Sequence, residues 1–123
     1  MPIRCLIVDD NQSFLDAARV LLEREGLTVA GVATTGAEAV RQAERLRPNV
    51  VLVDISLGEE SGVDLARRLV DDGLVDGATV VLISTRSEDD VVDLIAESPT
   101  AGFLPKAELS ASAIRELVEG RPQ

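Results

Sequence analysis

Five polar side chains whose chemistry suits a metal ion and a phosphoryl group follow apolar segments of this chain: Asp9, Asp10, Asp54, Ser84 and Lys106. Asp9 and Asp10 are adjacent, and two ionised carboxylates held close together disfavour each other's charged form. A solvent-exposed loop tolerates such a pair because water and salt screen the charges. A bound cation would instead require such a pair of carboxylates as ligands. Three carboxylates without a nitrogen or sulfur donor beside them favour Mg²⁺.

Asp54, beside such a cation, could serve as a carboxylate nucleophile that takes up a phosphoryl group. The hydroxyl of Ser84 and the ammonium of Lys106 could hold the phosphoryl oxygens, because positioning and charge neutralisation supply most of the catalysis in phosphoryl transfer. Lys106 is the only lysine among the 12 basic residues. A compact ammonium and a planar guanidinium present different shapes, so this choice favours contact with a small anion.

The segments between these residues alternate between strand and helix patterns. Apolar runs of strand length cover 3–8, 27–33, 49–55, 78–85 and 101–106. Helical periodicity covers 13–26, 36–48, 61–73, 87–99 and 110–120. The helix 13–26 is expected to bury Phe14, Ala17, Ala18, Leu21 and Leu22. Continuous apolar strands are typical of a parallel sheet covered by helices on both faces, so the predicted fold class is α/β, a doubly wound (βα)5 sheet of five parallel strands.

Ligands of doubly wound sheets bind at the carboxyl ends of the strands. The first predicted strand ends at Asp9 and Asp10, the third at Asp54, the fourth at Ser84 and the fifth at Lys106. Asp9, Asp10 or Asp54 alone is more typical of a solvated strand end or a helix cap than of a site, and Ser84 alone is more typical of a loop hydroxyl with a hydrogen-bond partner. Their joint position at one edge of the sheet favours a functional site.

Composition limits the classes of protein to which this chain can belong. Its 123 residues fit one domain, 1–123, and 46% hydrophobic residues with only 2% aromatics predict an aliphatic core. A net charge of −10 argues against direct binding of nucleic acid or an anionic membrane. Cys5 is the single cysteine and is predicted to be a buried core residue, which fits a reducing, cytoplasmic setting. No apolar run has the length of a membrane span, and the N-terminus lacks a signal-peptide layout.

Four segments in this order resemble the receiver domain of two-component response regulators. They are VDD at the first strand, VDISLGEESG around Asp54, LIST at the fourth strand and GFLPK at the fifth. The spacing also resembles the family, with 30 positions from Asp54 to Ser84 and 22 from Ser84 to Lys106. The resemblance covers the whole chain and implies a flavodoxin-like strand order, 2-1-3-4-5.

The resemblance implies a role for each site residue. Asp54 would accept a phosphoryl group from a histidine kinase or a phosphotransfer protein. Asp10, Asp54 and the backbone carbonyl of Ser56 would bind Mg²⁺ directly, and Asp9 would act through water. Roles for the remaining residues follow the same family pattern: Ser84 would contact the phosphoryl group, Lys106 would pair with it, and Phe103 would be the aromatic switch residue.

The sequence departs from the family pattern at several positions. Gly58 stands where a proline is usual after the phosphorylated aspartate, and Ala107 follows Lys106 where a proline, often in a cis peptide, is frequent. Thr85 is larger than the usual alanine or glycine, and Arg86 could reach the mouth of the site. We expect Thr85 and Arg86 to change the rate of dephosphorylation.

The function predicted is a phosphorylation-controlled switch that acts on a downstream protein or output domain, not a turnover enzyme. The alternative is a degenerate receiver that serves as a phosphorylation-independent docking module. A phosphatase with an aspartate nucleophile would carry a second acid at position 56, where this chain has Ser56. A flavodoxin-like cofactor binder would need aromatic rings to stack on its cofactor, and only 2% of the residues of this chain are aromatic. The resemblance also implies that the chain could form a homodimer.

Overall fold

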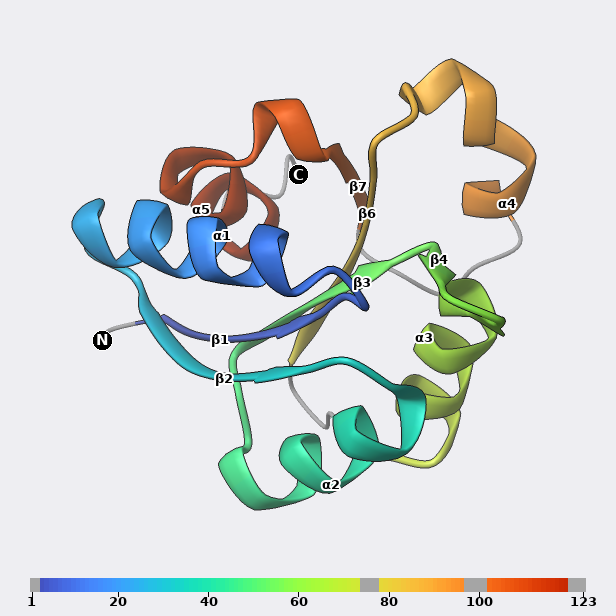
Figure 1. The fold of residues 1–123 in the computed structure, drawn as a ribbon, viewed down its shortest axis with the longest axis horizontal. Coiled ribbons are helices and arrows are strands. Elements are labelled where there is room, and N and C mark those ends of the chain that lie inside the picture. Colours follow the sequence, from blue (N-terminus) through green and yellow to red (C-terminus); the bar gives the residue numbers. More distant parts are fainter. Residues whose placement is uncertain (1–2, 74–77, 97–101, 120–123) are drawn as a thin grey trace.

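The computed structural model describes residues 3–73, 78–96 and 102–119, and its centre is a five-stranded parallel sheet (Figure 1). The strand order is β2-β1-β3-β6-β7. Because β4 and β5 form a separate two-stranded sheet, β6 and β7 are the fourth and fifth strands of this one, and the predicted order 2-1-3-4-5 is confirmed. The five strands are β1 (Arg4–Val8), β2 (Thr28–Ala33), β3 (Val50–Asp54), β6 (Thr79–Ser84) and β7 (Gly102–Pro105). Their register places the carboxyl ends of β1, β3, β6 and β7 at one edge.

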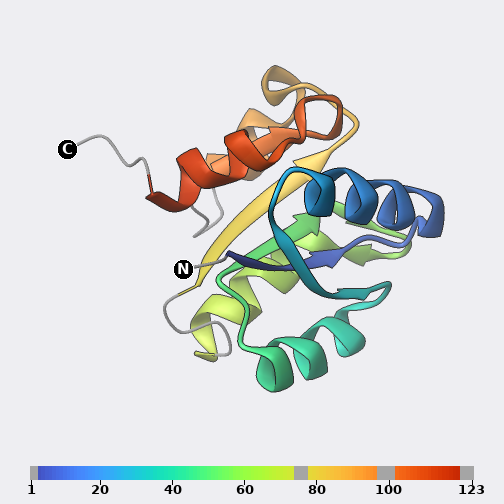
Figure 2. The same ribbon diagram turned by 90° about the vertical axis from the view of Figure 1, so that its left-hand side faces the viewer.

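Helices cover both faces of this sheet (Figure 2). On one face lie α1 (Gln12–Arg24) and α5 (Ala111–Glu119), and on the other lie α2 (Gly36–Leu46) and α3 (Gly62–Asp71). The short helix α4 (Val92–Ala96) follows a 3₁₀ turn, Glu88–Val91. Within the described ranges, no helix is both long and apolar enough to cross a membrane.

Alternate residues of each strand enter two separate cores. Leu6 and Val8 of β1 pack with α2 and α3, whereas Cys5 and Ile7 pack with α1 and α5. β3 divides its side chains in the same way, and all five of its residues are buried. This burial on both faces explains why the strands are continuous apolar runs in the sequence.

Local capping sets where three of the helices begin. The side chains of Asn11, Thr35 and Ser61 accept hydrogen bonds from the first turns of α1, α2 and α3. Each of these bonds satisfies a backbone N–H that has no partner inside its helix. The cap at Asn11 starts α1 only two positions after Asp9, which keeps the strand end and the helix start close together.

Two sequence predictions about helices need correction. α1 buries Leu15, Ala18 and Leu22, whereas Ala17 and Leu21 are exposed. Ala18 and Leu22 are confirmed as core residues and Phe14 is half-buried, but Leu15, which was not among the predicted residues, joins the core that includes Ile114 of α5. The predicted helix 87–99 begins as a 3₁₀ turn, and its residues 97–99 lie outside the described ranges.

A small hairpin that was not predicted follows β3. It pairs β4 (Ser56–Leu57) with β5 (Glu60–Ser61) in antiparallel fashion. Gly58 in its turn has a φ of 58°, a left-handed conformation that the proline ring forbids. Glycine adopts this conformation without strain, so Gly58 fits the turn of the hairpin.

Cys5 offers a test of the packed core. Its side chain is fully buried, and burial raises the pKa of the thiol to about 12. Since the thiolate is the reactive form, alkylation of the folded protein by iodoacetamide should stay slow and should not accelerate between pH 7 and pH 9. The measurement is the mass of the alkylated product over time, with the urea-unfolded protein as the control. Rapid alkylation of the folded protein at pH 9 would contradict this burial.

Candidate functional site

The predicted site residues meet at the carboxyl edge of the sheet. Asp9 follows β1, Asp54 ends β3, Ser84 ends β6 and Lys106 follows β7. α1 begins beside the ends of β1 and β3 (Figure 1). Segments that are distant in the sequence are therefore brought together because all of these strands run in the same direction.

Three carboxylates form a cluster at this edge. Asp9, Asp10 and Asp54 each place one oxygen within 4.8 Å of the others. Asp9 is fully buried, Asp54 is nearly so, and Asp10 is exposed. Backbone N–H groups hold one oxygen of each buried acid: Asn11 donates to Asp9 Oδ1 at 2.9 Å and Ser56 donates to Asp54 Oδ1 at 3.0 Å.

Lys106 joins the two buried acids. Its Nζ donates a hydrogen bond to Asp54 Oδ2 at 3.0 Å and lies 2.5 Å from Asp9 Oδ2. The second contact is an ion pair outside hydrogen-bond geometry, so Asp9 Oδ2 accepts no hydrogen bond from any described residue. A buried carboxylate oxygen without a hydrogen bond is unusual in native proteins, and it is a suitable ligand for a cation or water.

The charges in this cluster depend on one another. Burial raises the pKa of Asp9, and the nearby charge of Asp54 adds to this, although Lys106 and the Asn11 N–H act in the opposite direction. Burial alone would lower the pKa of Lys106, but its contacts with Asp9 and Asp54 outweigh burial and raise it. The ammonium therefore stays charged and offsets part of the repulsion between the acids. An added cation would offset more of it.

Ser84 and Phe103 lie on the neighbouring strands. Ser84 is buried, and its Oγ accepts a hydrogen bond from the Arg86 N–H at 3.0 Å. Phe103 pairs in register with Leu82 and packs, half-buried, against the core formed with α2 and α3. The structure therefore places Ser84 at the carboxyl edge of the sheet and Phe103 on β7 two positions further from that edge, and their predicted switching roles stay predictions.

The remaining positions singled out in the sequence also lie near this edge. Ser56 is exposed on β4, and the Thr85 and Arg86 side chains are exposed after β6. The Lys106–Ala107 peptide is trans, as are all peptides in the described part of the chain. A hollow of about 300 Å³ lies beside Asp54's loop, with Ser56 and Arg86 among the lining residues.

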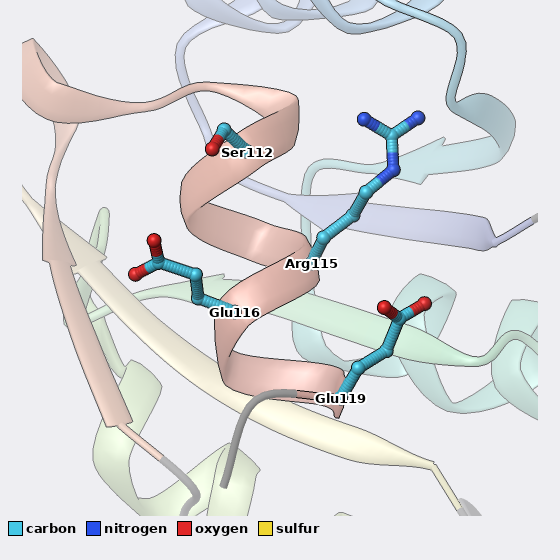
Figure 3. A pocket seen from close by; sticks show the side chains of 4 residues that line it. All are labelled: Ser112, Arg115, Glu116 and Glu119. Atoms are coloured by element: carbon cyan, nitrogen blue, oxygen red, sulfur yellow. The ribbon is translucent and has the colours of Figure 1, made fainter.

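A second hollow lies on the outer side of α5 and shares no residue with the acidic cluster (Figure 3). Its volume is about 390 Å³, and it is lined by Ser112, Arg115, Glu116 and Glu119. Arg115 is already engaged, since its guanidinium donates to the Glu25 carbonyl oxygen. None of the site residues predicted from the sequence is among the four residues that line this hollow.

Sequence reasoning missed two residues that shape the site. The Phe14 ring centroid lies 4.3 Å from Lys106 Nζ, whereas the periodicity of helix 13–26 indicated only a core role. Gly62, the first residue of α3, donates its N–H to the Ile55 carbonyl at 2.7 Å. A Cβ at Gly62 would lie 1.7 Å from the Asp54 carbonyl oxygen. No local pattern in the sequence reveals either contact, because both join segments that meet only in the fold.

A family model described as the response regulator receiver domain matches residues 5–119. Among curated relatives, the uncharacterized transcriptional regulatory protein YvfU of Bacillus subtilis is 32% identical over 97% of this chain. The response regulator GacA of Pseudomonas aeruginosa is 29% identical, also over 97% of this chain. The chain spans 60% of the first relative's length and 56% of the second's.

Solved structures show the same fold. A two-component response regulator of the LuxR family from Aurantimonas has a TM-score of 0.84 at 25% identity, with 98% of this chain and 88% of that chain covered. A CheY-like response regulator receiver domain protein from Methanospirillum hungatei has a TM-score of 0.72 at 26% identity, with 98% and 93% covered.

Gly62→Ala tests how closely α3 packs against the backbone of Asp54. The new methyl group must displace the backbone of Asp54 and Ile55, so we expect a loss of about 2–3 kcal/mol in the free energy of unfolding. Gly36→Ala is the matched control, because Gly36 also begins a helix and is buried. There the nearest atom is a Glu60 side-chain oxygen at 3.0 Å. The Glu60 carboxylate accepts the Gly36 N–H at 2.8 Å, so the methyl group requires only a small shift of a flexible side chain and no displacement of backbone. Urea unfolding measures both variants, and equal losses would contradict the close approach at Gly62.

Proposed function

Because the chain belongs to the response regulator receiver domain family, we propose that it accepts a phosphoryl group on Asp54 and transmits this event to a partner. The observation that supports the proposal is the environment of the Asp54 carboxylate. One oxygen accepts the Ser56 N–H and the other accepts the Lys106 ammonium. Two more carboxylates lie within 4.8 Å, so a nucleophile, a counter-charge and cation ligands share one small volume.

In the proposed step an Asp54 carboxylate oxygen donates an electron pair to the phosphorus atom of the donor. The bond between phosphorus and the leaving group breaks, and the leaving group keeps the bonding electron pair. The product is an acyl phosphate on Asp54. Lys106 then exchanges its contact with Asp54 Oδ2 for one with a phosphoryl oxygen, and the Ser84 hydroxyl donates a hydrogen bond to another.

The carboxylate cluster fits Mg²⁺. Its donors are oxygens alone, and Asp9 Oδ2 accepts no hydrogen bond from a described residue. Mg²⁺ takes one or two carboxylates, keeps several waters and bridges to phosphate oxygens. Asp10, Asp54 and the Ser56 carbonyl would hold the ion directly, and Asp9 would hold it through water. When bound, Mg²⁺ would neutralise charge on the phosphoryl oxygens and on the crowded acids.

Phosphorylation of Asp54 would cause a conformational change through Ser84 and Phe103. Ser84 ends β6, and Phe103 lies on the neighbouring strand β7. Movement of Ser84 toward a phosphoryl group would free space that the Phe103 ring enters, and a local charge event would thereby bias a two-state element. The output surface proposed is formed by α4, β7 and α5.

The donor is proposed to be a histidine kinase or a phosphotransfer protein, since the chain contains no histidine of its own. The recipient of the signal would be a downstream protein, an output domain or a second copy of the chain. Relatives such as YvfU are named as transcriptional regulators, but the acidic charge of this chain does not favour direct contact with DNA. The chain would act as one domain, 1–123.

The alternative function is a docking module that does not depend on phosphorylation. The complete set of three acids with Lys106 argues against it, because a docking surface has no need of a fully buried acid whose second oxygen, Oδ2, is paired only with an ammonium and accepts no hydrogen bond from a described residue.

Incubation with Mg²⁺ and acetyl phosphate tests the proposed function. We expect the intact mass to increase by one phosphoryl group, and we expect Asp54→Asn to show no increase because the nucleophile is gone. Asp64→Asn is the matched control, since Asp64 is an exposed acid on α3, and it should behave like the parent. No adduct on the parent, from acetyl phosphate or from any phosphorylated kinase, would favour the docking module.

Replacement of Lys106 tests the counter-charge. Lys106→Met should slow phosphoryl uptake roughly tenfold to a hundredfold, because a preorganised cation near the developing charge is lost. Lys106→Arg should restore only part of the rate, since a guanidinium is larger and planar. Initial rates at saturating Mg²⁺ give the comparison. A Lys106→Met variant as fast as the parent would remove Lys106 from the mechanism.

A further inference from the structure

We propose that Phe14 is a positioning residue that holds the Lys106 ammonium in place through the face of its ring. This inference rests on the proposed function, because it assigns to Phe14 the task of presenting Lys106 to the phosphoryl group. The observation behind it is the 4.3 Å distance between Lys106 Nζ and the Phe14 ring centroid. A cation within about 6 Å of an aromatic centroid is attracted by the negative face of the ring.

The ring completes the surroundings of the ammonium. Asp9 Oδ2 lies 2.5 Å and Asp54 Oδ2 lies 3.0 Å from Nζ. The Lys106 side chain is only 12% exposed, so little water competes with these contacts. Cation–π attraction is stronger where the cation is desolvated, and this is the situation of Nζ.

Hydrogen bonds connect the position of Phe14 to the acidic cluster. The Asn11 N–H donates to Asp9 Oδ1 at 2.9 Å, and Asn11 Oδ1 accepts the Phe14 N–H at 3.1 Å. These two bonds join the end of β1 to the first turn of α1. The backbone that carries the ring is therefore tied through Asn11 to the same carboxylate that contacts Lys106.

A purely structural role for Phe14 would require an apolar side chain but not an aromatic ring. Phe14 is half-buried and packs against the core between the sheet and α1. Leucine at position 14 would also supply apolar contact, because burial of apolar area does not require an aromatic ring. Only an aromatic ring offers an attractive face to the ammonium. The two roles separate when the electron density of the ring is changed at nearly constant shape.

In the proposed switch, the Phe14 ring would be a fixed partner for the long, flexible side chain of Lys106. The Lys106 side chain has four methylene groups joined by rotatable bonds. An ammonium free to turn to solvent would spend a smaller fraction of its conformations in position to contact a phosphoryl oxygen. The ring restricts Nζ to the side of the cluster where Asp54 lies. When Asp54 is phosphorylated, the ammonium changes its anionic partner and keeps the ring contact.

Kinetics with graded ring chemistry test this role. The variants are Phe14→Leu, Phe14→Tyr and a series with one, two or three ring fluorines at position 14, assayed for phosphoryl uptake from acetyl phosphate. We expect Phe14→Leu to be about threefold to tenfold slower, which is the rate effect of one cation–π contact. Phe14→Tyr should retain the parent rate, and the rate should fall stepwise with fluorination. The dissociation constant for Mg²⁺ should stay unchanged throughout.

A parent-like rate in Phe14→Leu would overturn the proposal. So would a slow Phe14→Leu combined with parent-like rates across the fluorinated series, because that result identifies packing as the only role. The kinetic arm therefore separates an electronic contribution of the ring from its volume.

An NMR measurement keeps this inference separate from the proposed function. Lys106 is the only lysine, so protein labelled with ¹³C-lysine gives the signals of this side chain alone. In the parent we expect shifted and unequal signals for the two Hε protons, and in Phe14→Leu we expect their collapse to one unshifted position. Phe103→Leu, which removes the other phenylalanine, should keep the parent pattern. If the parent takes no phosphoryl group, the proposed function fails, and the Hε signals still decide whether the ring holds Lys106. Equal, unshifted Hε signals in the parent would overturn the contact itself.

Discussion

The structure depends on an electrostatic constraint: carboxylates are crowded at the edge of a buried sheet, and one ammonium lies between two of them. Asp9 is fully buried and Asp54 nearly so, and ions of like charge in such surroundings are costly unless a counter-charge offsets them. Lys106 supplies that charge at 2.5 Å and 3.0 Å. In the proposed function, a bound cation would offset the carboxylates and a phosphoryl group on Asp54 would pair with the ammonium.

The parallel sheet makes this crowding possible. β1, β3 and β7 run in the same direction, so their ends deliver Asp9, Asp54 and Lys106 to one place without a long loop. Two aliphatic cores, one on each face, hold these strands in register. The close approach of Gly62 to Asp54 and the Asn11 cap of α1 then fix the two neighbouring chain segments against the site. The packed cores thus hold a few charged groups accurately in place.

The sequence predicted the parts of the fold that local pattern controls. Apolar runs located all five strands of the sheet, and the polar residue after each run located Asp9, Asp54, Ser84 and Lys106 at its carboxyl edge. Predictions were weaker where tertiary packing chooses among similar residues. Both Leu15 and Leu21 are apolar and lie on α1, and only contact with the sheet and α5 decides that Leu15 is the buried one. Phe14 and Lys106 are far apart in the chain, so the ring contact could not be read from spacing.

The central claim is that Lys106 exchanges a carboxylate for a phosphoryl oxygen at Asp54 while Phe14 and the acids stay in place. The most direct test is a crystal structure of the protein with Mg²⁺ and beryllium trifluoride, a stable mimic of the phosphoryl group. The account predicts the mimic on Asp54, Mg²⁺ among the three acids, and Lys106 Nζ within hydrogen-bond distance of a fluorine and still over the Phe14 ring. A structure in which Nζ remains paired with Asp9 and Asp54, with the mimic bound elsewhere or absent, would contradict it.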